Sequence, residues 1–240
     1  LYRDGGGHES PSYNAIKLDF IRVSQVMEEI RAQHPEIYPV EQYPDIFANE
    51  KASSIFDYFV AMNTLGVFQP SIGDGGSQIG VIKRHAPHSW STVYAENLFG
   101  FQKYGEPRYA RAATLRNGTI APGKLFDTYP GDELKMALED PASEIYTGPR
   151  LLDGYGVGIL ESEDGDNGRA LVLNYAAIVG HRQANNLHME LYARGMNILP
   201  DLGYPFTWDY TQQWDCHTMG HNTVTVNDTI ADMGQCAGNA

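Results

Sequence analysis

The spacing of apolar residues changes once along this 240-residue chain, and that change limits the possible folds more than any other feature. Up to Asn117, apolar residues recur every three or four positions, as they do in amphipathic helices. From Gly156 onward they alternate in short runs between Gly-, Asp- and Asn-rich turns, as in strands with one buried face. The sequence therefore predicts an α+β protein, with helices first and an antiparallel sheet after them.

Four helices are expected in the first part, over residues 11–33, 45–63, 89–104 and 107–116. The first begins at a Ser-Pro cap and should bury Ile16, Phe20, Val23, Val26, Met27 and Ile30. The second should bury Ile46, Phe47, Ile55, Phe56, Phe59 and Val60. Helices joined by loops, without strands between them, indicate paired α-hairpins.

Strands are expected over residues 156–160, 170–175, 187–192 and 223–226, with residues 119–150 as a connector before them. The third strand alternates Leu187, Met189 and Leu191 with His188, Glu190 and Tyr192. Many short strands separated by turns favour an antiparallel sandwich. Residues 228–240 contain no closing strand, so we expect the sandwich to be cut short.

Four residues with metal-binding or acid–base side chains lie near the strand ends, namely His181, Gln183, Asp201 and His221. Such a set could ligate a metal ion or exchange protons with a substrate. The alternative is structural, because a single His beside a Gly is more often a surface or capping residue. These four residues alone leave both interpretations open.

The same stretch contains five short motifs in order: Gly180-His181, Asn186-Leu187, Leu191-Tyr192-Ala193-Arg194-Gly195, Asp201-Leu202-Gly203-Tyr204 and His221-Asn222-Thr223-Val224. They resemble the β-sandwich motifs of the heparinase II/III-like polysaccharide lyases, a superfamily that also contains alginate lyases. The resemblance implies that residues 1–118 are the C-terminal part of an (α/α) toroid, that residues 119–150 connect, and that residues 151–240 are a truncated antiparallel β-sandwich. One departure is Gln183, which stands where the family commonly has the second, metal-binding His of a His-x-His motif.

The N-terminal segment Asp4–Asn14 resembles the Asp-Gly…Glu…Tyr segment of the same lyases, and residues 70–75 resemble a Pro…Gly-Asp loop at their cleft. The resemblance implies that Tyr13 is the catalytic base at the start of an inner helix. Taken alone, Tyr13 would more simply be a packing aromatic residue. In the family, an Asn and a His on a helix upstream of the tyrosine grip the sugar carboxylate, and we expect both to lie outside this chain.

The resemblance implies β-elimination on an acidic polysaccharide that contains uronic acid, such as alginate or a glycosaminoglycan. A base removes the C5 proton while donors neutralise the neighbouring carboxylate. An unperturbed tyrosine has a pKa of about 10, so Tyr13 needs a positive setting, for which Arg3, His8 and His181 are candidates. His181 is also the alternative acid. The candidate substrate contacts are Arg3, His8, Glu9, Arg84 and His85.

A divalent metal ion is the expected cofactor, held by Gln183, Asp201 and His221. Zinc is expected first, but an amide oxygen is a harder and weaker ligand than imidazole, so manganese and calcium are alternatives. We expect such an ion to brace the strands that present His181 rather than to touch the substrate.

The chain is acidic, with 17 Lys and Arg against 30 Asp and Glu and a net charge of −13, which argues against nucleic acid as a partner. No apolar run is long enough to span a membrane. We expect an acidic polysaccharide as the partner and a secreted or periplasmic location, with the signal segment outside this chain. Two alternatives stay open: an (α/α)-toroid glycoside hydrolase using Glu9 and Asp74, or a non-catalytic carbohydrate-binding protein, favoured if Tyr13 is remote from His181.

Overall fold

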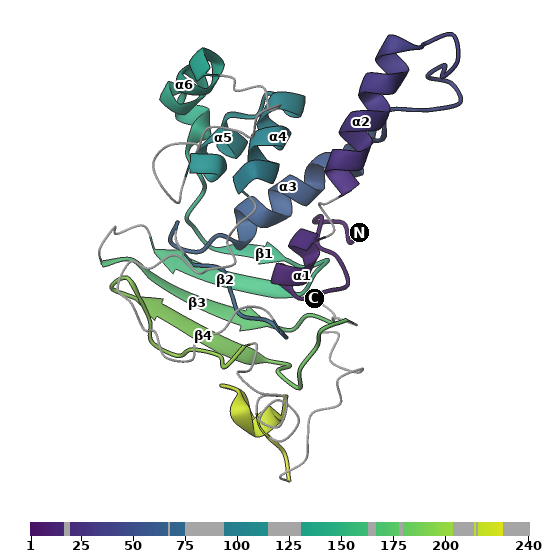
Figure 1. Ribbon diagram of the computed structural model, residues 1–240. Helices are drawn as coiled ribbons and strands as arrows, with labels where there is room; N and C mark the ends of the chain where they lie inside the picture. The colour runs from purple at the N-terminus through teal and green to yellow at the C-terminus, as the bar shows by residue number, and fades with distance from the viewer. Residues whose placement is uncertain are drawn as a thin grey trace.

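The computed structural model describes residues 1–16, 20–66, 68–74, 94–114, 131–162, 167–177, 180–203, 214 and 216–227. Within these ranges, the helices α3 to α6 lie together above strand β1, and five antiparallel strands form one sheet in the order β1-β2-β3-β4-β5 (Figure 1). Strands that follow one another in sequence are also neighbours in the sheet, which makes it a meander. The predicted α+β class is confirmed.

The α-helices of the described residues are α1 (Pro11–Ile16), α2 (Phe20–Gln33), α3 (Glu50–Met62), α4 (Tyr94–Tyr104), α5 (Pro107–Thr114) and α6 (Gly131–Glu139). Short 3-10 helices cover Ile46–Ala48, Pro141–Ser143 and Thr218–Gly220. Helix α3 begins where the Asn49 side chain accepts a hydrogen bond from the Lys51 amide, as expected of an N-cap asparagine. Residues 17–19, 89–93 and 115–116, which the sequence places in helices, lie outside the described residues.

The core of the helical layer is aromatic. Phe56 of α3 is fully buried, and its ring centroid lies 6.3 Å from that of Phe99, 5.9 Å from that of Tyr104 and 5.5 Å from that of Tyr109. Rings at such distances add to the free energy gained by burying their apolar area. The predicted core face of the second helix is confirmed at Phe47, Ile55, Phe56, Phe59 and Val60, whereas Ile46 is exposed.

The predicted burial of the first helix is wrong along α2. Val23, Val26, Met27 and Ile30 are all exposed, and Figure 1 shows α2 projecting away from the other helices. The side chains of Ile16 and Phe20 lie outside the description. Periodicity identifies the apolar face of a helix, but it does not identify what covers that face.

Helix α6 is a second difference, because it occupies residues that the sequence predicts as a connector. Its Leu134 and Ala137 are buried, and Arg111 of α5 donates a hydrogen bond to the Leu138 carbonyl at 2.7 Å. Nine residues with two buried positions give too short an apolar pattern to be recognised as a helix.

The sheet consists of β1 (Arg150–Leu152), β2 (Val157–Ser162), β3 (Arg169–Asn174), β4 (His188–Ala193) and β5 (Met196–Asn197). Its buried face carries Val157, Ile159, Ala170 and Val172. On the opposite face Leu160, Leu171 and Leu191 lie directly across from one another on β2, β3 and β4. The strands over 157–162 and 169–174 agree with the prediction to within a few residues.

Strand β4 turns its polar residues inward. His188, Glu190 and Tyr192 are almost completely buried, while Leu187, just before the strand, and Met189 are exposed. Buried polar groups need partners. The inverted orientation therefore indicates that the sheet holds a polar network at this position.

The strand predicted over residues 223–226 is absent from the described residues, and this prediction is wrong. Val224 is 82% exposed and Val226 68%. The Met189 amide donates to the Asn222 carbonyl at 3.0 Å, but no ladder continues beyond that contact in the described part of the chain. A β-branched residue favours a strand only where a partner strand and a packed face are available.

Arg150 connects the helical layer to the sheet through hydrogen bonds and an ion pair. Its guanidinium donates to the carbonyls of Ala61 and Asn63 at the end of α3 and forms an ion pair with Glu161 of β2. Glu161 in turn accepts a hydrogen bond from the Leu65 amide at 2.7 Å. No helix in the described parts of the chain is long and apolar enough to cross a bilayer.

Candidate functional site

Tyr13 and His181, the two residues predicted as catalytic, are in direct contact. Tyr13 lies on α1 and His181 lies in the segment before β4, and their rings stack with centroids 3.5 Å apart and planes 4° from parallel. The contact leaves no room for a sugar between the rings, so a substrate would approach their edges. The carbohydrate-binding alternative, which requires Tyr13 to be remote from His181, loses its support.

Glu9 completes what we call the junction cluster, made of Glu9, Tyr13 and His181. An oxygen of the Glu9 carboxylate lies 2.7 Å from Nδ1 of His181. Glu9 and Gly180 form a parallel β-bridge, and a Cβ on Gly180 would lie 2.3 Å from Oε2 of Glu9. Glycine at 180 therefore permits the carboxylate to reach the imidazole. The His181 side chain is 43% exposed, so the cluster is accessible to a ligand.

The backbone of His181 is held in an uncommon conformation. Its φ of +51° lies in the left-handed region, which non-glycine residues rarely adopt. The Asp74 amide donates to the His181 carbonyl at 2.8 Å, and the Gly180 amide donates to the His8 carbonyl at 3.2 Å. Conformations of this kind cost about 1–3 kcal/mol and gather at functional sites. The Pro…Gly-Asp loop thus reaches the junction cluster through Asp74.

For the other residues predicted to contact the substrate, the contacts of Arg3 and His8 lie outside the junction cluster. Arg3 forms an ion pair with Asp153, which offsets its charge, and Nδ1 of His8 lies 3.1 Å from the Tyr2 hydroxyl. Of the three candidates for the positive setting of Tyr13, His181 is the one whose ring stacks on it. Arg84 and His85 lie outside the described residues.

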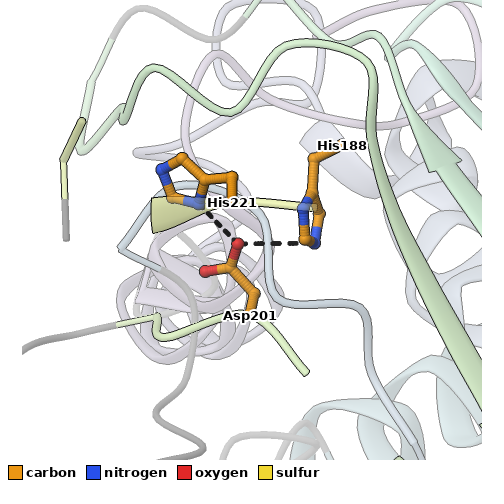
Figure 2. Close-up of side chains that lie close together, drawn as sticks. All are labelled: His188, Asp201 and His221. Atoms are coloured by element: carbon orange, nitrogen blue, oxygen red, sulfur yellow. Dashed lines mark hydrogen bonds and ion pairs between the residues drawn. The ribbon is translucent and has the colours of Figure 1, made fainter. Parts of the chain in front are cut away.

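A second polar group, which we call the buried triad, consists of His188, Asp201 and His221 (Figure 2). Oδ2 of Asp201 lies 2.7 Å from Nδ1 of His221 and 3.3 Å from Nε2 of His188. One candidate ligand atom from each residue lies within 4.8 Å of the others, and no side chain of the triad is more than 1% exposed. Two imidazoles and a carboxylate are a donor set that zinc and related ions accept.

The protonation and hydrogen bonding of the triad fit a metal site. Nε2 of His221 is buried without a hydrogen-bond partner, and Nε2 of His188 lies near Asp201 at 3.3 Å without forming a hydrogen bond, which is rare for buried polar atoms. Burial lowers the pKa of His188, which favours the neutral imidazole that binds metal ions. The triad could therefore hold a metal ion.

Gln183 lies between the junction cluster and the buried triad. Its Nε2 donates to Oδ1 of Asp74 at 3.0 Å and to the Gly203 carbonyl at 2.9 Å. The Gly203 amide donates to Oδ1 of Asp201 at 2.7 Å. Gln183 thus bridges the loop that holds His181 and the segment that carries Asp201. Its Oε1 is buried without a hydrogen-bond partner, and its predicted role as a ligand stays a prediction.

Glu190 explains why β4 turns its polar face inward. Its carboxylate accepts hydrogen bonds from the Ser71 amide at 2.6 Å, the Tyr192 hydroxyl at 2.5 Å and Nδ2 of Asn197 at 3.2 Å. Burial raises the pKa of Glu190 to about 8, against the opposing effect of these hydrogen bonds. The network ties β4 to the loop that contains Asp74.

Sequence reasoning missed His188 as a member of the site. The alternation along β4 placed His188, Glu190 and Tyr192 on one face, which was the available signal. His188 and Glu190 are ionisable, share one face of the strand and precede Asp201 and His221 in the sequence. Such a pattern is as consistent with a buried polar site as with a face exposed to solvent.

Residues 166–238 match the family model described as Heparinase II/III-like, C-terminal. The fold is similar to crystal structures of heparan sulfate lyase HepC from Pedobacter heparinus, with a TM-score of 0.61, and of a mutant of that enzyme, with 0.58, both at 16% sequence identity. It is also similar to the heparinase III product of the BT4657 gene, with a TM-score of 0.57 and 15% identity. No curated protein matches the chain in sequence.

These likenesses cover 96% of this chain but only 31% of the HepC chains and 32% of the BT4657 product. The chain thus spans about a third of the length of those proteins, and at this identity the likeness shows the fold alone. The predicted resemblance is confirmed, because residues 166–238 match the model of the heparinase II/III-like C-terminal domain.

Proposed function

We propose that this protein is a polysaccharide lyase that cleaves a chain containing uronic acid by β-elimination. The observation that carries the proposal is the stacking of Tyr13 on His181, because two motifs far apart in sequence each contribute one residue to it. The fold shared with heparan sulfate lyase HepC favours a glycosaminoglycan over alginate as the substrate. In this proposal the helices are part of an (α/α) toroid and the sheet is part of a β-sandwich.

The proposed step uses Tyr13 as the base. Tyr13 takes the C5 proton, a C4–C5 double bond forms, the C4–O4 bond breaks, and the departing O4 receives a proton from Tyr13 or His181. A protonated His181 would place positive charge against the Tyr13 ring and stabilise negative charge on its oxygen. The same charge would help to neutralise the carboxylate of the substrate.

We propose a structural role for a divalent ion, with zinc as the first candidate and manganese or calcium as alternatives. His188, Asp201 and His221 would hold it, and it would brace β4 against the segments that follow it. Gln183 would connect this region to His181, because it donates a hydrogen bond to the Asp74 side chain and the Asp74 amide donates to the His181 carbonyl. The protein would act in a secreted or periplasmic setting, where acidic polysaccharides occur.

Ultraviolet absorbance on addition of a purified polymer tests the proposal. Elimination leaves an unsaturated sugar that absorbs, so we expect a rise with heparan sulfate and a smaller rise, or none, with alginate. New reducing ends without absorbance would indicate hydrolysis and would support the alternative in which Glu9 and Asp74 are the two carboxylates. Polymer binding without either product would contradict an enzymatic function.

A further inference from the structure

We propose that Glu9 is a positioning residue for His181 rather than a contact for the substrate. The inference rests on the proposed lyase function and assigns Glu9 a part in the same site. Its carboxylate lies 2.7 Å from Nδ1 of His181, which is hydrogen-bond distance. Glu9 and His181 belong to different parts of the fold, so their contact fixes the imidazole relative to α1.

The chemistry of the pair determines which nitrogen of His181 carries the proton. An ionised carboxylate only accepts hydrogen bonds, so Nδ1 of His181 must donate to Glu9. In the charged ring the second proton then lies on Nε2, at the opposite edge of the imidazole, where it can pass to the departing O4, and in the neutral ring Nε2 holds the lone pair. A carboxylate that fixes the tautomer and orientation of a histidine in this way is a recurrent arrangement in enzymes.

Glu9 is itself held in place by buried groups. Its carbonyl accepts hydrogen bonds from the Tyr155 hydroxyl at 2.8 Å and from Nδ2 of Asn14 at 3.0 Å, and its amide donates to Oδ1 of Asn14 at 3.3 Å. Tyr155 is 1% exposed and Asn14 is 5% exposed. Asn14 follows Tyr13 on α1, so one residue braces both the helix of Tyr13 and the backbone of Glu9.

The charge and exposure of Glu9 disfavour a direct contact with the substrate. A carboxylate repels the carboxylates and sulfates of an acidic polymer. The Glu9 side chain is 22% exposed, against 43% for His181, and its near oxygen is engaged by the imidazole. Gly180 also supports a positioning role for Glu9, because the absence of a side chain at Gly180 leaves the space that the Glu9 carboxylate occupies.

The test combines three variants of the full chain with nitrogen-15 NMR of the histidine rings and steady-state kinetics. Glu9→Ala removes the acceptor, and Gly180→Ala displaces the carboxylate without removing it. Glu9→Gln keeps a carbonyl that accepts from Nδ1. Glu139→Gln on α6, an exposed glutamate, is the charge-matched control.

We expect Glu9→Ala and Gly180→Ala to shift His181 away from the tautomer protonated at Nδ1. They should lower kcat by at least about 10- to 100-fold with little change in KM, the range found for partners that orient metal-binding histidines. Glu9→Gln should restore most of the tautomer and part of kcat, and Glu139→Gln should change neither. Melting curves identify any variant that fails to fold. If Glu9→Ala fails to fold, the tautomer and kcat of Gly180→Ala are compared with those of Glu9→Gln to test the role of Glu9.

An unchanged tautomer in Glu9→Ala would overturn the inference. So would a rise in KM at constant kcat, because that is the signature of a substrate contact. If the wild-type chain eliminates none of the polymers tested, the proposed lyase function fails, while the NMR comparison still decides whether Glu9 fixes His181.

Discussion

The junction cluster and the buried triad are built from similar residue types, yet their environments are opposite. His181 is 43% exposed and stacks on Tyr13, whereas His188 and His221 are enclosed around Asp201. Groups that solvent reaches can meet a polymer and exchange protons with it. Enclosed groups cannot, but the loss of one leaves its buried partners unsatisfied. The junction cluster should therefore control the rate of reaction, and the buried triad should control the stability of the fold.

The largest expected effect is that of Tyr13→Phe on the proposed elimination. Phe keeps the ring that stacks on His181 and removes only the hydroxyl, so folding and polymer binding should be nearly unchanged. Proton transfer by a positioned group contributes about 10²–10⁴-fold, and kcat should fall by at least that range because Tyr13 serves as base and acid. Initial rates of ultraviolet absorbance measure it.

Tyr43→Phe is the matched control, because Tyr43 is 43% exposed and lies in the loop after α2. It should retain full activity. A Tyr13→Phe variant with more than about a tenth of the wild-type rate would show that another group takes the proton, since general-base catalysis is worth more than that. His8, next to Glu9, would then be the leading candidate.

Asp201→Ala should produce the largest loss of stability. Asp201 is fully buried, accepts from the Gly203 amide and lies between two histidines, so its removal leaves several buried groups unpaired. Breaking a buried charged network costs about 3–5 kcal/mol of unfolding free energy. Denaturant melts measure the cost, and metal analysis of the wild type and the variant measures whether the proposed ion is bound and then lost.

The exposed Asp132→Ala on α6 controls for the loss of a carboxylate, and should cost less than about 1 kcal/mol, as for a charge in the first turn of a helix. Loss of turnover in Asp201→Ala at unchanged stability would contradict a purely structural role for the buried triad. The triad would then belong to the chemistry.

The sequence predicted the order of helices and sheet because apolar spacing is a local property. Helix α3 lies within the predicted range 45–63, although a 3-10 helix over Ile46–Ala48 and an extended Asn49 precede it, and β3 lies within one residue of the predicted 170–175. The sequence-based prediction failed where the burial of a residue depends on partners distant in the sequence. The apolar face of α2 is exposed, and Val224 has no strand to pair with in the described residues. Propensity marks what a segment can form, and tertiary contacts decide whether it does.

The site was predictable in part for the same reason. Tyr13 and His181 were found through motifs, since a motif records residue types at fixed spacing. His188 was missed because an alternating strand is normally read with its apolar side inward, and β4 is inverted. The role of Gln183 was not predictable, because its hydrogen bonds to Asp74 and Gly203 depend on three segments meeting in space.

Gln183→Leu tests how strongly the two clusters are joined. The change keeps the volume and removes both hydrogen bonds of Nε2, leaving Asp74 and the Gly203 carbonyl short of a donor. We expect a loss of about 1–3 kcal/mol in unfolding free energy, the cost of unsatisfied buried groups. The rate should fall as well, but less than in Tyr13→Phe, because His181 keeps its ring and loses only support.

Gln42→Leu, at an exposed position, is the control for the lost amide. The double variant Gln183→Leu with Asp201→Ala should lose less stability than the sum of the single changes, since residues in one network are not additive. Full additivity, with an unchanged rate in Gln183→Leu, would show that the clusters are independent.

The smallest effect is expected for a substitution at Val224. This substitution tests whether the stability of the region depends on burial or only on closeness in sequence to the buried triad. Val224 lies three residues after His221 of the buried triad, yet its side chain is 82% exposed while that of His221 is enclosed. Val224→Ser should therefore change the unfolding free energy by less than about 0.5 kcal/mol and leave the rate unchanged, as for surface substitutions in general. A loss above about 1.5 kcal/mol, typical of a buried side chain, would show that residues 223–226 pack as the strand that the sequence predicts. The boundary of the buried region would then extend past His221, and the triad would owe part of its rigidity to that strand.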